Sequence, residues 1–193
     1  MSKREMSFAL YKNISDIIEL TNGEISSRND KQVMVALNNI KEIYSSFNHK
    51  DKFLFINSLS KRTDEESRLL LSVLKPVMLD ESYLNLLEEL TPYLNKRNEI
   101  TQEDKKIPYY LSAESYRNFV KQKVDTLPLE TIEALQKRAM ESFKTGKGLS
   151  EEITMNHVLA LASILSEVKD RLVEEQKALE EKMLDKELQE NLL

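Results

Sequence analysis

The chain has 193 residues with a net charge of −5, and it contains no Cys, 3 Gly and 4 Pro. So few glycines and prolines, with 32% charged residues, favour long helices over a turn-rich β fold, and the absence of Cys excludes disulfides and thiolate metal sites. The longest apolar runs are much shorter than a bilayer span and no apolar signal segment begins the chain, so we expect a cytoplasmic protein, in the host cytoplasm if it is viral.

The first two helices are predicted over residues 3–20 and 33–47. Asn22-Gly23 supplies a residue pair that tolerates the turn after the first helix, and the polar residues 26–30 offer caps for the second. Both segments repeat apolar residues at helical spacing: Met6, Leu10, Ile14, Ile17 and Ile18 in the first, and Val33, Leu37, Ile40, Tyr44 and Phe47 in the second.

Three shorter helices are predicted before residue 95. The first is a dense apolar segment that we expect to be buried on most sides: Phe53, Leu54, Ile56 and Leu59. Thr63 and Glu66 fit a capping box that opens the next helix, which Pro76 kinks or ends. Asp80 is a candidate cap for a further helix, which Thr91-Pro92 ends.

A polar interval over residues 95–107 is the best candidate for a linker. It would separate an N-terminal helical subdomain, residues 1–94, from a C-terminal part, residues 108–193, although the two parts could also form one continuous domain. Ser112 caps a helix in the second part, and Leu127-Pro128 begins another that reaches Phe143.

The last predicted helix spans residues 150–193 and contains neither Gly nor Pro. Ser150 is its expected cap after the loop Gly146-Lys147-Gly148. At about 1.5 Å per residue it is longer than a compact domain is wide, so we expect part of it to project or to pack on another chain. The fold class expected from all these patterns is all-α: an irregular bundle of about six or seven short to medium helices with a long C-terminal amphipathic helix extending from it.

The C-terminal helix also holds the acidity of the chain. Residues 150–193 include 11 acidic and 5 basic side chains, whereas the rest of the chain has a net charge of +1. Beyond Leu172 the apolar residues thin out, and those that remain could occupy a groove on a protein partner or on another copy, or could pack on the chain itself. The candidate partner-binding residues are Leu179, Met183, Leu184, Leu188 and Leu192.

The sequence offers little for catalysis, so we expect a protein that is not an enzyme and needs no metal or cofactor. The two histidines, His49 and His157, belong to no Glu-x-x-His or His-Glu-x-x-His motif, and His157 fits a packed position beside an apolar stripe. Gly146-Lys147 lacks the first glycine and the hydroxyl residue of a phosphate-binding loop.

A nucleic-acid interface is the alternative that the sequence leaves open. Residues 105–147 contain 9 basic and 5 acidic side chains, with Tyr109, Tyr110 and Tyr116 available to stack on bases. A sequence pI near 5.3 and the lack of a basic stripe on the scale of a domain argue against it. The candidate contacts are Arg117, Lys121, Lys123, Lys137 and Arg138.

The preferred hypothesis is therefore a non-enzymatic interaction or assembly protein. An oligomeric adaptor, an assembly chaperone and a scaffold-type protein of a virus or phage all fit this class. The expected partner is a protein or further copies of the chain, with nucleic acid as the less favoured alternative and no membrane span.

Overall fold

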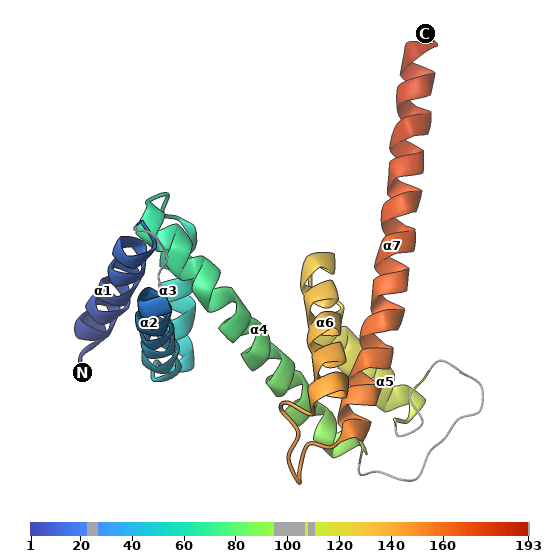
Figure 1. Cartoon of the computed structure of the whole chain (residues 1–193). Coiled ribbons are helices and arrows are strands. Elements are labelled where there is room, and N and C mark those ends of the chain that lie inside the picture. Colours follow the sequence, from blue (N-terminus) through green and yellow to red (C-terminus); the bar gives the residue numbers. More distant parts are fainter. Residues whose placement is uncertain (23–26, 95–106, 108–110, 193) are drawn as a thin grey trace. The chain divides into compact units, whose positions relative to one another are not determined.

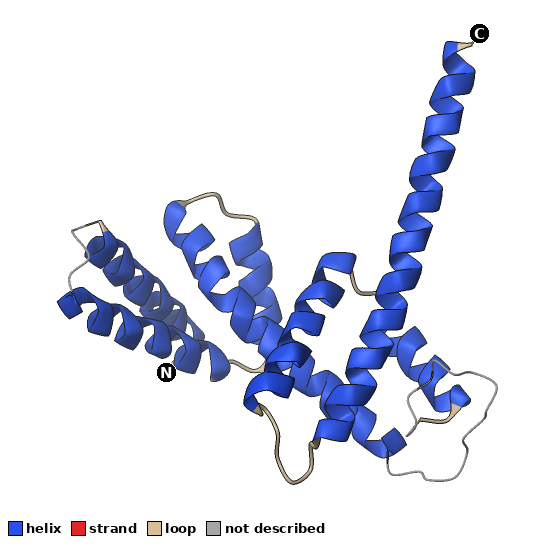
Figure 2. Cartoon of the chain, turned by 45° about the vertical axis from the view of Figure 1, so that its right-hand side comes forward, coloured by secondary structure: helices blue, strands red, loops and turns tan. Residues whose placement is uncertain are grey.

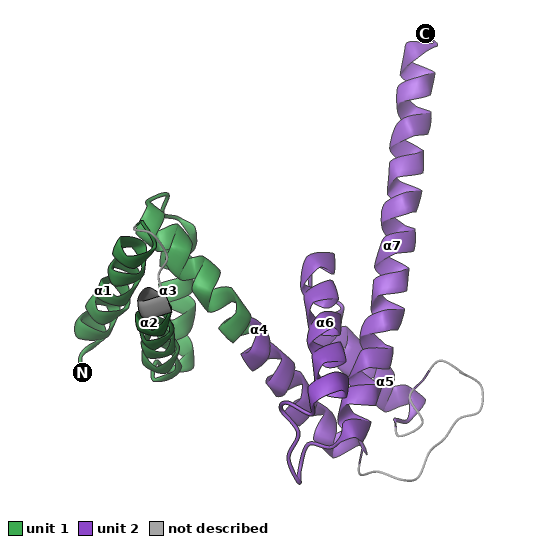
Figure 3. Cartoon of the chain, viewed as in Figure 1, with its two compact units in different colours: residues 1–78 green, residues 79–193 purple. Residues whose placement is uncertain are grey.

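The structure is a computed structural model that describes residues 1–22, 27–94, 107 and 111–192. Within these ranges the chain forms seven α-helices and one π-helical segment, and no strand occurs in them (Figure 2). The predicted all-α fold with a long C-terminal helix is confirmed. The chain divides into two compact units, Met1–Met78 and Leu79–Leu193 (Figure 3).

The first unit contains α1 (Lys3–Thr21), α2 (Ser27–Ser45), α3 (His49–Ser60) and the first half of α4 (Glu65–Leu94). Ser2 and Glu5 form a capping box at the start of α1: the Ser2 hydroxyl accepts the Glu5 amide, and the Glu5 carboxylate accepts the Ser2 amide. The first two predicted helices are confirmed. Their apolar stripes supply most of the core: Leu10, Ile14, Ile17, Ala36, Ile40, Tyr44, Phe47, Leu59, Leu70 and Leu74.

The expectation that α3 is buried on most sides is wrong. Only Leu59 of this helix is fully buried, while Phe53 is 67% and Leu54 51% exposed. Phe55 and Ile56 lie on the Leu59 side and are half-buried against the core. A helix of 3.6 residues per turn cannot bring Phe53 and Leu54 to that same side, so a dense apolar run leaves them facing outward.

The prediction of separate helices between residues 63 and 94 is also wrong, because α4 is one helix of 30 residues. Its cap differs from the expected Thr63: the Asp64 carboxylate accepts the Ser67 amide at 3.1 Å. The Ser67 hydroxyl also donates to the Asp64 carboxylate, at 2.7 Å, and this hydrogen bond is the main reason that the pKa of Asp64 lies below its ordinary value. Asp80, which was expected to cap a helix, lies inside α4 and forms an ion pair with Arg138.

Pro76 and Pro92 do not end α4, although each lacks the amide hydrogen that a helix interior uses. Both prolines are exposed, and so are Ser72 and Glu88, whose carbonyl groups lose their usual partners. Water can therefore bind those carbonyls. Apolar residues on both sides of Pro76 are buried, Leu74 before it and Tyr83 after it, and this burial favours the continuous helix.

The second unit contains the rest of α4 with α5 (Ala113–Phe119), η1 (Val120–Val124), α6 (Leu129–Thr145) and α7 (Met155–Asn191). Ser112 caps α5 as predicted, accepting the Ser115 amide at 3.1 Å. In the π-helical segment η1 the Asp125 amide reaches back five residues to the Val120 carbonyl at 2.8 Å. The largest buried residues of this core include Tyr83, Leu87, Leu90, Phe119, Ile132 and Leu135.

The long helix α7 begins at Met155 rather than at Ser150, so the predicted start is wrong. Ser150 does accept the Ile153 amide at 3.0 Å, but its own amide donates to the Ile153 carbonyl, which closes a local turn instead of a helix. The cap that opens α7 is Thr154. The preceding glycine loop is confirmed, with Gly146 at φ 69° ending α6.

The predicted linker over residues 95–107 lies outside the described residues except for Ile107, and it stays a prediction. The same holds for the turn at Gly23 and for Tyr109 and Tyr110. The division between the two compact units falls within α4, between Met78 and Leu79.

Candidate interaction surfaces

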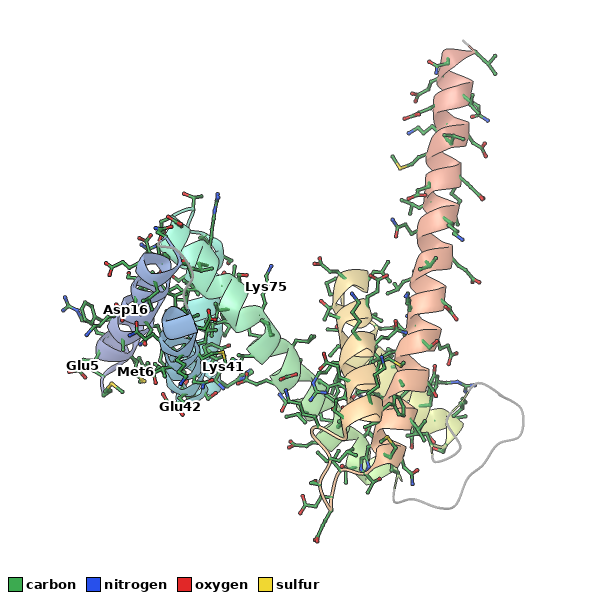
Figure 4. The ribbon with its side chains drawn as sticks, viewed as in Figure 1. Glu5, Met6, Asp16, Lys41, Glu42 and Lys75 are labelled. Carbon is green, nitrogen blue, oxygen red and sulfur yellow. The ribbon has the colours of Figure 1, made fainter. Side chains whose placement is uncertain are left out.

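The last part of α7, residues 174–192, is named here the C-terminal arm. Every residue in it is exposed, whereas the first part of α7 is buried through Val158, Leu161, Leu165 and Val168. Figure 1 shows α7 extending well beyond α6 within the second unit, and Figure 4 shows the side chains of the arm radiating from a single helix. Within the second unit, the buried core therefore ends before the arm begins.

All five predicted partner-binding residues lie on this arm. The exposed fraction of their side chains runs from 55% for Leu188 to 86% for Leu192, with Leu179, Met183 and Leu184 near 60%. At 100° per residue, Leu179 and Met183 lie on the side of α7 that is buried in the body. Leu184, Leu188 and Leu192 form a second row at steps of four. These residues are thus exposed, and their binding of a partner stays a prediction.

The body holds α7 firmly up to the point where the arm begins. Arg171 pairs with Asp125 just after η1, and the Tyr116 hydroxyl donates to Glu167. Lys169 lies 3.8 Å from Glu133 of α6. Leu172 packs half-buried against the core, and no described residue beyond Val173 is even half-buried. The arm therefore extends from the point at which these contacts end.

His157 anchors the other end of α7. Its ring is 6% exposed, its Nδ1 accepts the Thr154 amide at 3.1 Å, and its Nε2 lies 3.2 Å from the Thr91 hydroxyl of α4. Because Nδ1 accepts, Nε2 carries the proton and donates to Thr91. Burial lowers the pKa of His157. The packed role predicted for this histidine is confirmed.

Two of the predicted nucleic-acid contacts, Arg117 and Lys121, line one groove of about 990 Å³ between α5–η1 and α7. The same groove contains four carboxylates: Asp125, Glu167, Asp170 and Glu174. A phosphate backbone requires a surface with an excess of positive charge. With Arg171 as its third cation, this groove has no such excess.

Lys123 and Lys137 lie elsewhere. Lys123 is 3.3 Å from Glu89 of α4, and Lys137 lines a second groove, between α6 and α7, with Lys144 and Lys169. The predicted cations are therefore not brought together on one face. Of the three predicted stacking tyrosines, Tyr116 is the one that the structure describes. It is buried, and its hydroxyl donates a hydrogen bond to Glu167.

Arg138, another of the predicted nucleic-acid contacts, is buried and so is not placed to bind a ligand at the surface. Its guanidinium is 2.5 Å from Asp80, 3.0 Å from the Ser142 hydroxyl and 4.9 Å from the centre of the Tyr83 ring. Burial raises the pKa of the Tyr83 phenol, which donates to Ser142. The spacing contained the signal: Leu135, Arg138, Ala139 and Ser142 occupy one helix face, and all are buried.

Sequence reasoning missed a second exposed surface, on α3. Phe53 and Leu54 face outward there, with Lys50, Asn57 and Lys61 exposed around them. Steps of three and four link these five residues, so they form one continuous strip, named here the α3 surface. The apolar run of α3 could not predict it, because a helix that is apolar on all sides can also be buried on all sides.

The described residues hold no cluster of three or more side chains that could ligate a metal ion. Among the helices that the structure describes, none combines the length and apolar character that a membrane span requires. Comparison with models of known protein families, with curated proteins and with solved structures finds no match to this chain.

Proposed function

We propose that this chain is a non-enzymatic interaction and assembly protein whose C-terminal arm docks into an apolar groove of a protein partner. The carrying observation is the exposure of Leu184, Leu188 and Leu192, which stand at steps of four on one side of the C-terminal arm. Anchors at such intervals on an exposed helix are the usual means by which a helix occupies a groove.

Leaving these apolar side chains in water costs free energy that burial against a partner would recover. Full burial of one Leu contributes about 1.5–3 kcal/mol, so the three leucines of this row offer a gross gain of roughly 4.5–9 kcal/mol before the costs of association. An arm that served only for solubility needs no large apolar residues. The anchors therefore favour a docking role.

The charge of the arm indicates what the groove looks like. Residues 174–192 contain seven acidic and three basic side chains, a net charge of −4. Two arms side by side would repel each other, and the heptad seam that begins at Leu165 and Leu172 next requires apolar residues where Glu175 and Lys182 stand. A groove with Lys or Arg along its rim fits the arm better than a second arm does.

A photo-crosslinker tests this proposal. Benzoylphenylalanine replaces Leu184, in the row of Leu184, Leu188 and Leu192, in one variant. In a matched control it replaces Lys182, which lies about 160° away from Leu184 around the helix. In an extract of the native cells we expect the first variant to form an adduct with one protein, and the crosslinked peptide should combine apolar residues with Lys or Arg. The adduct should disappear when Leu179 and Leu188 are changed to Ser.

Equal crosslinking from both positions, or an adduct that persists in the Ser variant, would contradict the proposal. The fold of each variant can be checked by its thermal unfolding, which substitutions on an exposed arm should not change.

A further inference from the structure

We infer that the partner of the C-terminal arm is the α3 surface of a second copy of this chain. This inference rests on the proposed function and specifies its partner. Both surfaces are exposed helix faces with two or more large apolar side chains.

The α3 surface has the chemistry that the arm requires. Phe53 and Leu54 form its apolar centre, and Lys50 and Lys61 lie toward its two ends. None of its five residues is acidic. The single carboxylate of α3, Asp51, lies 2.7 Å from the Lys3 ammonium, which neutralises it.

The charges of the two units are also complementary. Residues 1–78 contain 12 basic and 10 acidic side chains, a net charge of +2, whereas residues 79–193 contain 16 basic and 23 acidic ones, a net charge of −7. An acidic arm is therefore attracted to the first unit of another copy and repelled by the second.

The two surfaces are similar in length. The row from Leu184 to Leu192 covers about 12 Å of helix, and the strip from Lys50 to Lys61 covers about 17 Å, at 1.5 Å per residue. Two helices packed side by side over this length would bury Phe53 and Leu54 under the leucines of the arm. The lysines at the ends of the strip would then meet the glutamates that flank the anchors.

The contact would join different surfaces on the two copies, so it is heterologous. Each chain would offer its arm to one neighbour and its α3 surface to another, and such contacts generate open chains or closed rings. The mass in solution should therefore rise in steps of the 22.5 kDa chain as concentration increases. Added salt should weaken this association, because surface charges contribute to it.

Two variants test the inference by light scattering and analytical ultracentrifugation. One carries Phe53→Ser and Leu54→Ser, and the other carries Leu179→Ser, Leu184→Ser and Leu188→Ser. Each alone should lose self-association by about tenfold or more, because each lacks half of the contact. Phe8→Ser is the matched control: Phe8 is 72% exposed on α1 and should be dispensable.

The decisive measurement mixes the two variants. One variant retains a working arm and the other a working α3 surface, so the mixture should form a complex of two chains and nothing larger. Lys50→Glu with Lys61→Glu should weaken the wild-type association, whereas Lys41→Glu on α2 should not. All these positions are exposed, and unchanged thermal unfolding will show that the variants fold.

Several results would overturn the inference. A wild-type chain that stays monomeric excludes a second copy, and if Leu184 still crosslinks to a different protein, the proposed function stands without it. Self-association that survives the α3 changes but not the arm changes would indicate contact between arms. Binding of a monomeric chain to anionic lipid vesicles through Phe53 and Leu54 would assign the α3 surface to a membrane instead.

Discussion

The Nε2 atom of His157 lies 3.2 Å from the Thr91 hydroxyl, and this hydrogen bond joins the first turn of α7 to the last turn of α4. The Thr91 hydroxyl in turn donates a hydrogen bond to the Leu87 carbonyl, at 3.3 Å. On the other side of the ring, Nδ1 accepts the Thr154 amide. Both ring nitrogens thus form hydrogen bonds while the ring is neutral. A second proton, on Nδ1, would remove the acceptor of the Thr154 amide at the start of α7.

We therefore predict that acid destabilises the second unit through His157. Burial keeps the folded pKa of His157 below its ordinary value of 6.5, so the unfolded chain binds this proton first. The free energy of unfolding should be intact above pH 6.5, fall as pH drops below it, and level off only below the folded pKa. Urea titrations from pH 8 to pH 5 measure this slope. His157→Gln should flatten it, whereas the same change at exposed His49 should leave it in place; an unchanged slope in His157→Gln would contradict the prediction.

Replacing Arg138 by Met should destabilise the protein by about 2–3 kcal/mol. The change leaves Asp80 without its cation and removes a donor from the buried Ser142 hydroxyl. Because the Asp80 side chain is 40% exposed, water offsets part of the loss. The neighbouring Lys137→Met tests an exposed position and should change the unfolding free energy by less than about 0.5 kcal/mol. Equal effects from the two substitutions would refute a buried role for Arg138.

Gly148→Ala should cost more stability than Gly146→Ala. Both glycines have positive φ, 89° and 69°, which costs an L-residue about 1–2 kcal/mol. At Gly148 the new Cβ would also lie 3.3 Å from the Arg138 guanidinium, whereas at Gly146 its nearest neighbour is at 4.0 Å. Thermal unfolding of both variants checks the order. The reverse order would mean that the Arg138 side chain moves away from the new Cβ at little cost in free energy.

Removing the C-terminal arm should leave the folding of the body unchanged. A chain that ends at Val173 should keep its unfolding free energy within about 0.5 kcal/mol, because every described residue that it lacks is exposed. A chain that ends at Glu167 also loses buried Val168 and half-buried Leu172, so it should be less stable by several kcal/mol. Denaturant unfolding of both truncations measures the difference. A destabilised first truncation would show that the arm supports the body.

Pro76→Ala should stabilise α4. Pro76 is exposed and lies inside a continuous helix, where proline costs about 3 kcal/mol relative to alanine. Alanine restores the amide that donates to the Ser72 carbonyl. A rise in the unfolding temperature is expected, and Lys75→Ala, at the exposed preceding position, serves as the control. A fall in stability would show that the chain uses the proline geometry.

Much of this fold could be predicted because its local signals agree. The stripe from Val33 to Phe47, the cap at Ser112 and the glycine loop at residues 146–148 predict features that the structure contains. Where the prediction was wrong, two local signals competed. Pro76 suggested a break, but burial of the apolar residues on both sides favoured one helix. Ser150 suggested a cap, but a local turn with Ile153 used that side chain.

The candidate surfaces were only partly predictable. The leucines of the arm followed from the thinning of the apolar stripe after Leu172. The α3 surface did not, since no pattern within one helix states how many sides its neighbours cover. Arg138 was assigned to the surface by its charge, although its place between Leu135 and Ala139 on the inner face of α6 pointed to the core.

The arm also has a kinetic signature. A helix without tertiary contacts depends on the intrinsic helix propensity of its residues, and residues 174–192 contain no Gly or Pro and many Glu, Lys and Leu. Its backbone amides should exchange with deuterium in a gradient, slowest beside Arg171 and fastest toward Leu192, while those of the buried part of α7 open only with the core. A bound partner would abolish that gradient, so amide exchange along one helix reports occupancy residue by residue.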